Sequence, residues 1–212
     1  MTRPNYGRLT AWLIAAWFAA SLSAAALGLI QTEPGRPPFP LLVAVAVPLG
    51  AFGLWYAASR SFREFVLALS PRALTLVQSW RTAGFVFLVL ARYRILPAGF
   101  ALPAGWGDIA IGATAVFVAS RLAVPKHRGI FILWQLLGML DLVTAVTLGA
   151  TAALVNPNGI PTTPMTALPM SLIPTFAVPL LFLLHIICIA QARGWAKEQS
   201  TGLGSGLNSV AV

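Results

Sequence analysis

The sequence predicts an all-α, polytopic integral membrane protein: six transmembrane helices in one bundle, with both termini cytoplasmic. The chain of 212 residues is 58% hydrophobic and only 9% charged, and its mean hydropathy is +0.82. Soluble domains carry about 25% charged residues, so little of this chain is suited to face water. Its apolar residues gather into runs of about 20, the length that crosses a bilayer as a helix.

Six such runs follow one another along the chain. The predicted spans are residues 9–30, 41–58, 73–91, 106–124, 129–154 and 170–190. Ser70-Pro71 suits the start of the third span, because serine caps helix N-termini and proline fits the first turn. Residues 1–198 are therefore predicted to form a single transmembrane domain. The Gly/Ser-rich tail, residues 199–212, is predicted to be disordered.

The first run has a second interpretation. Arg3 and Arg8 precede it, and the small residues at 21–26 would suit cleavage of a secretory signal. A signal has an apolar region of about 7–15 residues, and this run is longer. We therefore expect a retained helix.

The basic residues predict the orientation of the spans. Ten of the 14 lie in segments on the side of the N-terminus, three lie on the other side, and Arg81 lies within a span. This bias follows the positive-inside rule and places both termini in the cytoplasm. A net charge of +9 would suggest nucleic acid in a soluble protein, but here the charges sit in short loops, so the expected partner is the lipid bilayer. Arginine, alanine, glycine and proline abound, which is typical of a GC-rich genome and indicates a bacterial cytoplasmic (inner) membrane.

Two connecting segments have a distinct character. Residues 61–69 are short and amphipathic, and are predicted to lie along the inner membrane interface. Residues 155–169 carry no charge and four prolines, so we expect an irregular segment that caps the outer face.

Small residues recur in three spans, at four-residue spacing in the first and the fifth. Helices in lipid associate closely where side chains are small. These stripes are Ala16, Ala20, Ala24 and Gly28; Gly105, Gly107 and Gly112; and Ala145, Gly149 and Ala153. They predict tight helix packing within the fold, and they also offer faces for a homo-oligomer.

Ionisable and amide side chains within the spans are the main functional signal. A charge in hydrocarbon costs several kcal/mol (about 3 on insertion scales), so such residues usually face a partner, a cavity or a pathway. The candidates for a transport or proton pathway are Arg81, Asp141, His185, Asp108, Gln78 and Gln135. Helical spacing places Gln78 on the face of Arg81 and Gln135 on the face of Asp141.

Each charged candidate has a structural and a functional interpretation. Arginine stays protonated, so Arg81 needs a partner, and we predict that it pairs with Asp141. That pair is either a fixed structural lock or an anion or proton site. Asp108 is expected at the start of its span, where a carboxylate caps backbone donors. From the depths of these residues we expect a ladder of polar groups across the bilayer.

His185 has three interpretations: a packed core histidine, a proton relay with Asp141, or a ligand. A six-coordinate haem would need a second axial ligand, because His185 is the one histidine within a span. That ligand would be Met139 of the same chain or a histidine of a second subunit. His185 and Cys188 share a helix face, but two ligands do not make a metal site.

The functional prediction is a small permease, channel or proton-coupled carrier for a small solute or ion. The sequence has no phosphate-binding loop, no dinucleotide fingerprint, no HExxH and no GxSxG. These absences argue against hydrolytic and nucleotide-driven enzymes, and leave open an intramembrane enzyme of an unfamiliar type. The alternatives are a redox subunit that binds haem or quinone through His185, and a membrane scaffold or assembly factor without catalysis.

Overall fold

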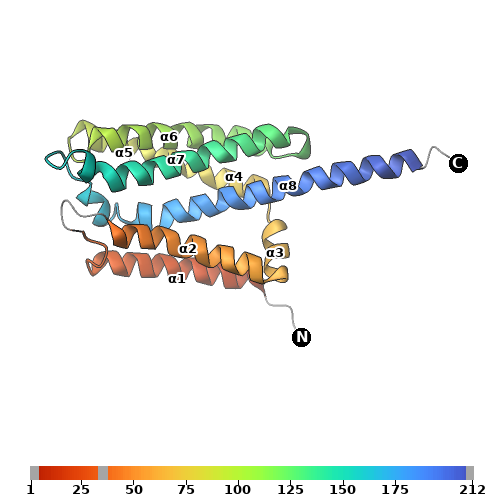
Figure 1. Cartoon of the computed structure of the whole chain (residues 1–212), viewed down its shortest axis with the longest axis horizontal. Helices are drawn as coiled ribbons and strands as arrows, with labels where there is room; N and C mark the ends of the chain where they lie inside the picture. Colours follow the sequence, from red (N-terminus) through yellow and green to blue (C-terminus); the bar gives the residue numbers. More distant parts are fainter. Residues whose placement is uncertain (1–4, 33–37, 209–212) are drawn as a thin grey trace.

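The computed structural model describes residues 5–32 and 38–208, and within these ranges it consists of helices and loops without strands. Figure 1 shows the long helices running along one common direction. In chain order the elements are α1 (Tyr6–Ala26), α2 (Phe39–Ala58), α3 (Arg60–Leu67), α4 (Pro71–Val77), η1 (Gln78–Gly84), α5 (Phe85–Arg92), α6 (Ala98–Phe117), η2 (Val118–Leu122), η3 (Pro125–His127), α7 (Arg128–Val155), η4 (Thr163–Thr166), η5 (Ile173–Ala177) and α8 (Val178–Asn208).

Six helical segments are long and apolar enough to cross a membrane, which confirms the predicted number. They are Tyr6–Ala26, Phe39–Ala58, Pro71–Arg92, Ala98–Leu122, Pro125–Val155 and Ile173–Trp195. Both ends of the described chain lie toward the same end of the bundle (Figure 1). We call this the N-terminal end, and we call the opposite end, which carries residues 156–172, the loop end. These features support a multi-pass membrane protein.

Side-chain caps fix the starts of three helices. The Asn5 side chain accepts a hydrogen bond from the Arg8 backbone N–H, 3.2 Å away. Ser59 and Ser70 cap α3 and α4 in the same way, and Pro71 follows Ser70 in the first turn. The predicted helix start at Ser70-Pro71 is therefore confirmed.

The fourth span begins earlier than predicted, at Ala98 instead of residue 106. Gly99, Pro103 and Gly105 are poor helix formers in water. In a bilayer every backbone donor and acceptor needs an internal partner, and only a helix supplies these along one segment. The expected position of Asp108 at a helix start is consequently wrong: it lies inside α6, ten residues after Ala98.

Four of the six described spans contain turns other than α-helix. The fourth span ends in a π-helix, η2, and the fifth opens with a 3-10 helix, η3. The third span changes to a 3-10 helix, η1, at its centre and returns to α-helix in α5. The last span opens with a π-helix, η5, just before Pro179. Proline lacks a backbone donor, and a widened turn before it accommodates that loss. Pro48, by contrast, lies inside a continuous α2.

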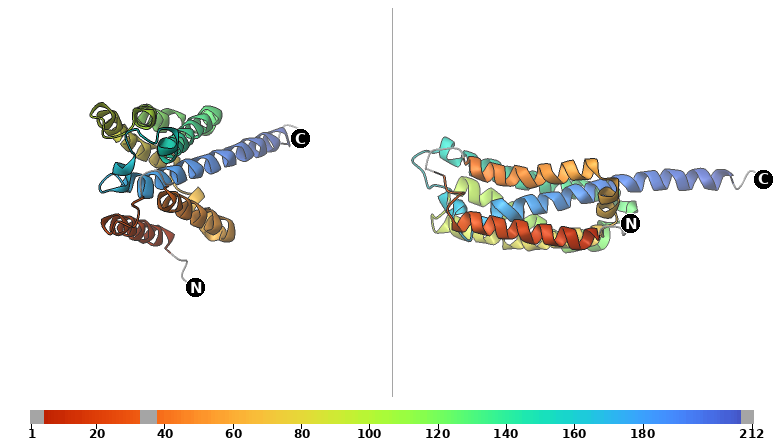
Figure 2. Two further views of the ribbon diagram at one scale, coloured as in Figure 1. Left: turned by 60° about the vertical axis from the view of Figure 1, so that its left-hand side comes forward. Right: turned by 90° about the horizontal axis from the view of Figure 1, so that it is seen from below.

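The spans divide into a compact group and two outlying helices. Figure 2 shows α4–α7 gathered on one side of α8, with α1 and α2 on the other. α2 packs on α8 and η5, and α1 packs on η5. The indole of Trp17 donates to the Thr175 carbonyl at 3.2 Å, and Phe176 packs between the rings of Trp17 and Phe18. The last span is therefore the central helix of the fold.

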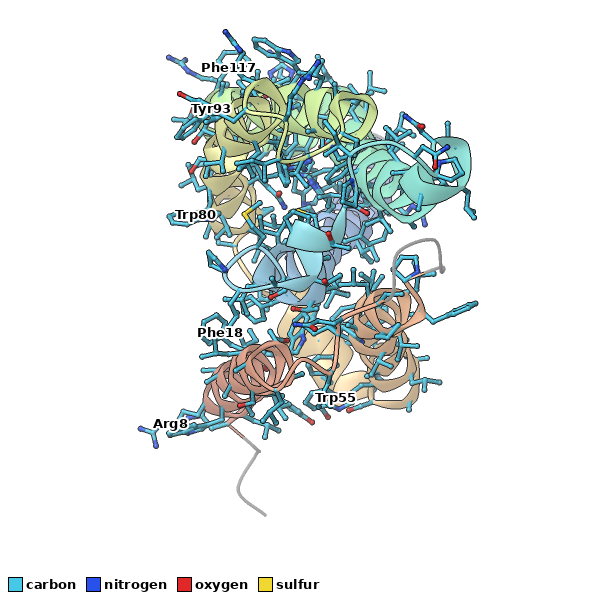
Figure 3. The ribbon with its side chains drawn as sticks, turned by 90° about the vertical axis from the view of Figure 1, so that its left-hand side faces the viewer. Arg8, Phe18, Trp55, Trp80, Tyr93 and Phe117 are labelled. Atoms are coloured by element: carbon cyan, nitrogen blue, oxygen red, sulfur yellow. The ribbon has the colours of Figure 1, made fainter. Side chains whose placement is uncertain are left out.

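Large apolar side chains cover the outside of the helix bundle. Trp80, Tyr93 and Phe117 are 74%, 73% and 60% exposed, and Figure 3 shows them on the outside of the bundle. An apolar exterior of this kind is what contact with lipid requires.

The amphipathic segment after α2 folds as α3, and its apolar face is turned to the protein. Phe62 and Val66 are buried, and the ring of Phe62 stacks on Trp55 with centroids 3.8 Å apart. Arg60 and Glu64 form an exposed pair on the other side. The amphipathic character is confirmed, and the apolar face packs on α2 and α8. The position of α3 at the membrane interface stays a prediction.

The end of the chain also differs from expectation. α8 continues as helix to Asn208, whereas the sequence predicted disorder from residue 199. No proline follows Pro179, and a helix extends by one hydrogen bond per residue once it is formed. Residues 209–212 lie outside the described part of the chain.

Candidate functional site

Arg81 lies at the centre of a buried polar cluster that joins four spans. Its side chain is 1% exposed and makes four hydrogen bonds. Nε donates to Asp108 Oδ1 at 2.7 Å, and Nη2 donates to Asp141 Oδ2. Nη1 donates to the Gly138 carbonyl at 3.2 Å and to His185 Nε2 at 3.3 Å. The predicted pairing of Arg81 with Asp141 is confirmed, and Asp108 is a second partner.

The cluster is a single mid-span site and not the expected ladder. Arg81, Asp108, Asp141 and His185 each lie near the middle of their own span. We call these four residues together with Gln135 the polar cluster. The earlier start of the fourth span produces this result, because it brings Asp108 to the depth of Arg81.

The formal charges of the polar cluster do not cancel. It holds one guanidinium and two carboxylates, so with both acids ionised it carries one excess negative charge. The Asp108 and Asp141 side chains are only 18% and 14% exposed. An uncompensated charge in such surroundings is costly, so it favours uptake of a proton or another cation.

Hydrogen-bond geometry assigns the tautomer of His185. Arginine can only donate, so His185 Nε2 accepts from Arg81 and carries no hydrogen. The ring hydrogen is then on Nδ1, which donates to Gln135 Oε1. His185 is 0% exposed and neutral in this arrangement.

A chain of hydrogen bonds extends from His185 toward the N-terminal end. Gln135 Nε2 donates to Thr75 Oγ1 at 3.2 Å, and Thr75 Oγ1 donates to the Pro71 carbonyl at 2.8 Å. In each hydrogen bond of this series the donor is the residue nearer to Arg81. We call His185, Gln135 and Thr75 the His185 chain, and its role is to hold the imidazole in one tautomer and orientation.

Glycines make room for the polar side chains. A methyl group on Gly84 would collide with Asp108, one on Gly107 with Asp141, and one on Gly138 with the His185 ring. Gly105 and Gly112 instead let α6 approach the backbone of the third span. Gly105, Gly107 and Gly112 were predicted as packing positions, and Gly107 in addition leaves room for the Asp141 carboxylate.

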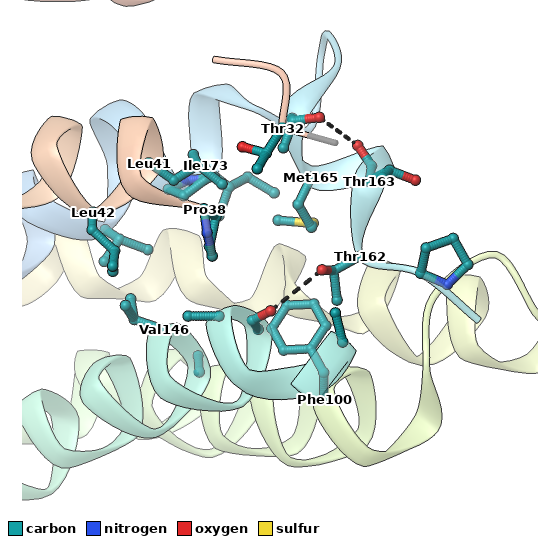
Figure 4. A pocket seen from close by; sticks show the side chains of 18 of the residues that line it. Thr32, Pro38, Leu41, Leu42, Phe100, Val146, Thr162, Thr163, Met165 and Ile173 are labelled. Carbon is teal, nitrogen blue, oxygen red and sulfur yellow. Dashed lines mark hydrogen bonds between the residues drawn. The ribbon is translucent and has the colours of Figure 1, made fainter. Parts of the chain in front are cut away.

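A cavity of about 140 Å³ lies between the polar cluster and the loop end. Figure 4 shows Leu41 and Leu42 of α2 on one side of it and Val146 of α7 on another, with Thr162 and Met165 from the loop. Among the described lining residues, Asp108 is the single ionisable one. The α7 stripe of Ala145, Gly149 and Ala153 lines this cavity.

Gln78 and Cys188 lie apart from the polar cluster's hydrogen bonds. Gln78 is fully buried, and its Nε2 donates to the Leu181 carbonyl of α8 at 3.1 Å. Cys188 Sγ lies 3.8 Å from Thr75 Oγ1. No group of three or more His, Cys, Asp or Glu residues in the described ranges could hold a metal ion. Haem ligation by His185 would have to break one of its two ring hydrogen bonds.

Three features of the site were not predicted from the sequence. Thr75 and the Gly138 carbonyl were not identified, although Thr75, Gln78 and Arg81 recur at helical spacing. The Trp134 indole donates to Thr114 Oγ1 at 2.9 Å, and its ring lies 5.8 Å from His185. A polar stripe along residues 75–81 was the signal that would have revealed Thr75.

Comparison with known proteins identifies a family but not an activity. The model of a domain of unknown function, DUF8737, matches residues 38–193. The chain belongs to this family. The DUF8737 match runs from α2 into α8, so it contains the whole polar cluster and the His185 chain, and it begins after α1. No curated protein and no solved structure matches the chain.

Proposed function

We propose that the protein is a carrier of the bacterial cytoplasmic membrane that couples the movement of a small solute to protons. The observation that carries this proposal is the excess carboxylate at the polar cluster, beside a cavity that reaches toward the loop end. Intramembrane ionisable groups of this kind mark ion and proton pathways. Asp108 and Asp141 take up and release the proton, and Arg81 holds the two carboxylates in place.

The departures from regular α-helix support a conformational change within the spans. Arg81 lies in the 3-10 segment η1, and π-helix precedes α8. Such segments inside helices frequently mark hinges and functional sites. Return of η1 to α-helix would rotate Arg81 relative to Asp108 and Asp141, and this rotation would release the carboxylates to bind and lose protons.

The proposal is tested in vesicles that contain purified protein and an internal pH-sensitive dye. The vesicles are challenged in turn with small cationic, anionic and neutral solutes. We expect at least one class to change the internal pH with wild-type protein, and the change to be lost in Asp141→Asn. The matched control is Glu64→Gln, which alters an exposed carboxylate on α3 and should transport normally. Absence of proton or solute movement for all three classes would refute a carrier.

The redox and scaffold alternatives gain no specific support from the described residues. Both nitrogens of His185 are engaged, and the polar cluster has more charge than a structural lock requires. A neutral lock would need one carboxylate for one guanidinium. We therefore retain one proposed function.

A further inference from the structure

The cavity at the polar cluster has the chemistry of a ligand site. Its walls are largely apolar and come from α2, α5, α6, α7, the loop and the last span. The Phe87 and Phe100 rings line it with centroids 5.7 Å apart. Asp108 is the one ionisable residue among its described lining residues. Ligand pockets typically combine such apolar walls with few polar groups that fix orientation.

Charge determines the sign of the ligand. Asp108 Oδ1 accepts from Arg81 Nε, and among the described residues no hydrogen-bond donor reaches Asp108 Oδ2. The polar cluster already has one negative charge in excess. A positive group at Asp108 would cancel that excess, whereas an anion would increase it.

The cavity walls determine the kind of cation. Hard metal ions need several oxygen ligands, and the described residues offer no group of three suitable side chains. Apolar and aromatic walls instead favour a ligand with a hydrocarbon body, and aromatic rings attract organic cations. A cavity of about 150 Å³ holds one benzene ring, and this cavity measures about 140 Å³.

We infer that the cavity binds a small organic ammonium ion, with its nitrogen at Asp108 and its apolar body toward Phe100, and exchanges it for a proton. This inference rests on the proposed carrier function and names the class of solute. The exchange balances: a protonated carboxyl gives up its proton, and the carboxylate pairs with the ammonium ion. Because a proton and an ammonium ion neutralise the same excess charge, only one of them binds at a time.

Binding is tested by calorimetry with benzylammonium on protein in phospholipid nanodiscs, with empty nanodiscs as the blank. Benzyl alcohol and benzoate have the same ring with a neutral or a negative group. We expect benzylammonium to bind, with release of up to one proton, measured as a difference in heat between two buffers. Benzyl alcohol should bind about tenfold more weakly or worse, and benzoate should not bind.

Two variants with matched controls locate the site. Asp108→Asn should weaken benzylammonium binding about ten- to hundredfold and abolish proton release, whereas Glu64→Gln should change neither. Val146→Phe fills the cavity without touching the polar cluster, so it tests the site even where Asp108→Asn fails to fold. Its control is Val143→Phe. Val143 is a residue of α7 that is 49% exposed and does not line the cavity, so this variant should bind benzylammonium normally.

The outcomes separate this inference from the carrier proposal. Equal binding of benzyl alcohol and benzylammonium, or unchanged binding in Val146→Phe, would overturn the ammonium site. No benzylammonium binding, together with proton movement driven by another solute in vesicles, would overturn the inference and leave the carrier intact. Benzylammonium binding with proton release, together with no proton or solute movement in vesicles for any of the three solute classes, would support the site and refute the carrier.

Discussion

Gly107 and Asp141 face each other where α6 packs on α7, and the Asp141 carboxylate occupies the space in which a side chain at 107 would begin. The carboxylate reaches Arg81 from this position. The absence of a single carbon at residue 107 therefore permits the ion pair.

Gly107→Ala should disrupt the polar cluster. The added methyl group has to displace Asp141 or push α6 from α7, and overpacking of this kind costs about 1–3 kcal/mol. We expect a lower thermal midpoint in detergent and reduced transport. Gly99→Ala is the control on the same helix, because nothing lies within 4 Å of its new methyl group. Equal stability of the two variants would contradict the assigned contact.

Removal of Arg81 should be more harmful than removal of all three charges. Arg81→Met alone leaves two buried carboxylates without their partner, and breaking a buried ion pair costs about 3–5 kcal/mol. Adding Asp108→Asn and Asp141→Asn to Arg81→Met should restore much of the stability, measured by thermal unfolding, but not transport. A triple variant that still transports would show that the polar cluster only stabilises the fold.

The sequence was sufficient for the number of spans but not for their depth. Apolar length and composition set the six spans, because the bilayer thickness is fixed. The start at Ala98 was not predictable, since Gly99 and Pro103 disfavour helix locally and the requirement for backbone hydrogen bonds in lipid overrides them. One misplaced helix start concealed the shared depth of Asp108 and Arg81.

Pairing between helices was predictable only where charge left little choice. Arg81 cannot lose its proton, and Asp141 was a carboxylate with no role as a helix cap, so their pairing followed. Gln135 and Thr75 have many neutral partners available, and spacing along one helix does not reveal which helix lies opposite. The cavity depends on α2, the loop and α7 together, and no local pattern encodes it.

His185 should be observed as the neutral tautomer with its hydrogen on Nδ1. The chain has two histidines, so ¹⁵N-histidine labelling in a His127→Gln background isolates the signal of His185. We expect one nitrogen with an attached hydrogen and one without, at neutral pH. Thr75→Val should broaden or shift both signals, because Gln135 loses its acceptor. Thr144 bonds only to the backbone of its own helix, so Thr144→Val is the control. A hydrogen on Nε2 would contradict the bond from Arg81.

Phe62→Ala should detach α3 from the bundle. Phe62 is 3% exposed and stacks on Trp55, and truncation of a buried phenylalanine costs about 3–5 kcal/mol. Because α3 connects α2 to the third span, detachment of α3 should raise proteolysis at residues 59–70 while the polar cluster stays folded. Leu67→Ala, on a residue 39% exposed, should remain resistant. Limited proteolysis in nanodiscs measures both variants. If Phe62→Ala is as resistant as wild type, α3 is held by the membrane surface, as the sequence alone suggested, and not by α2.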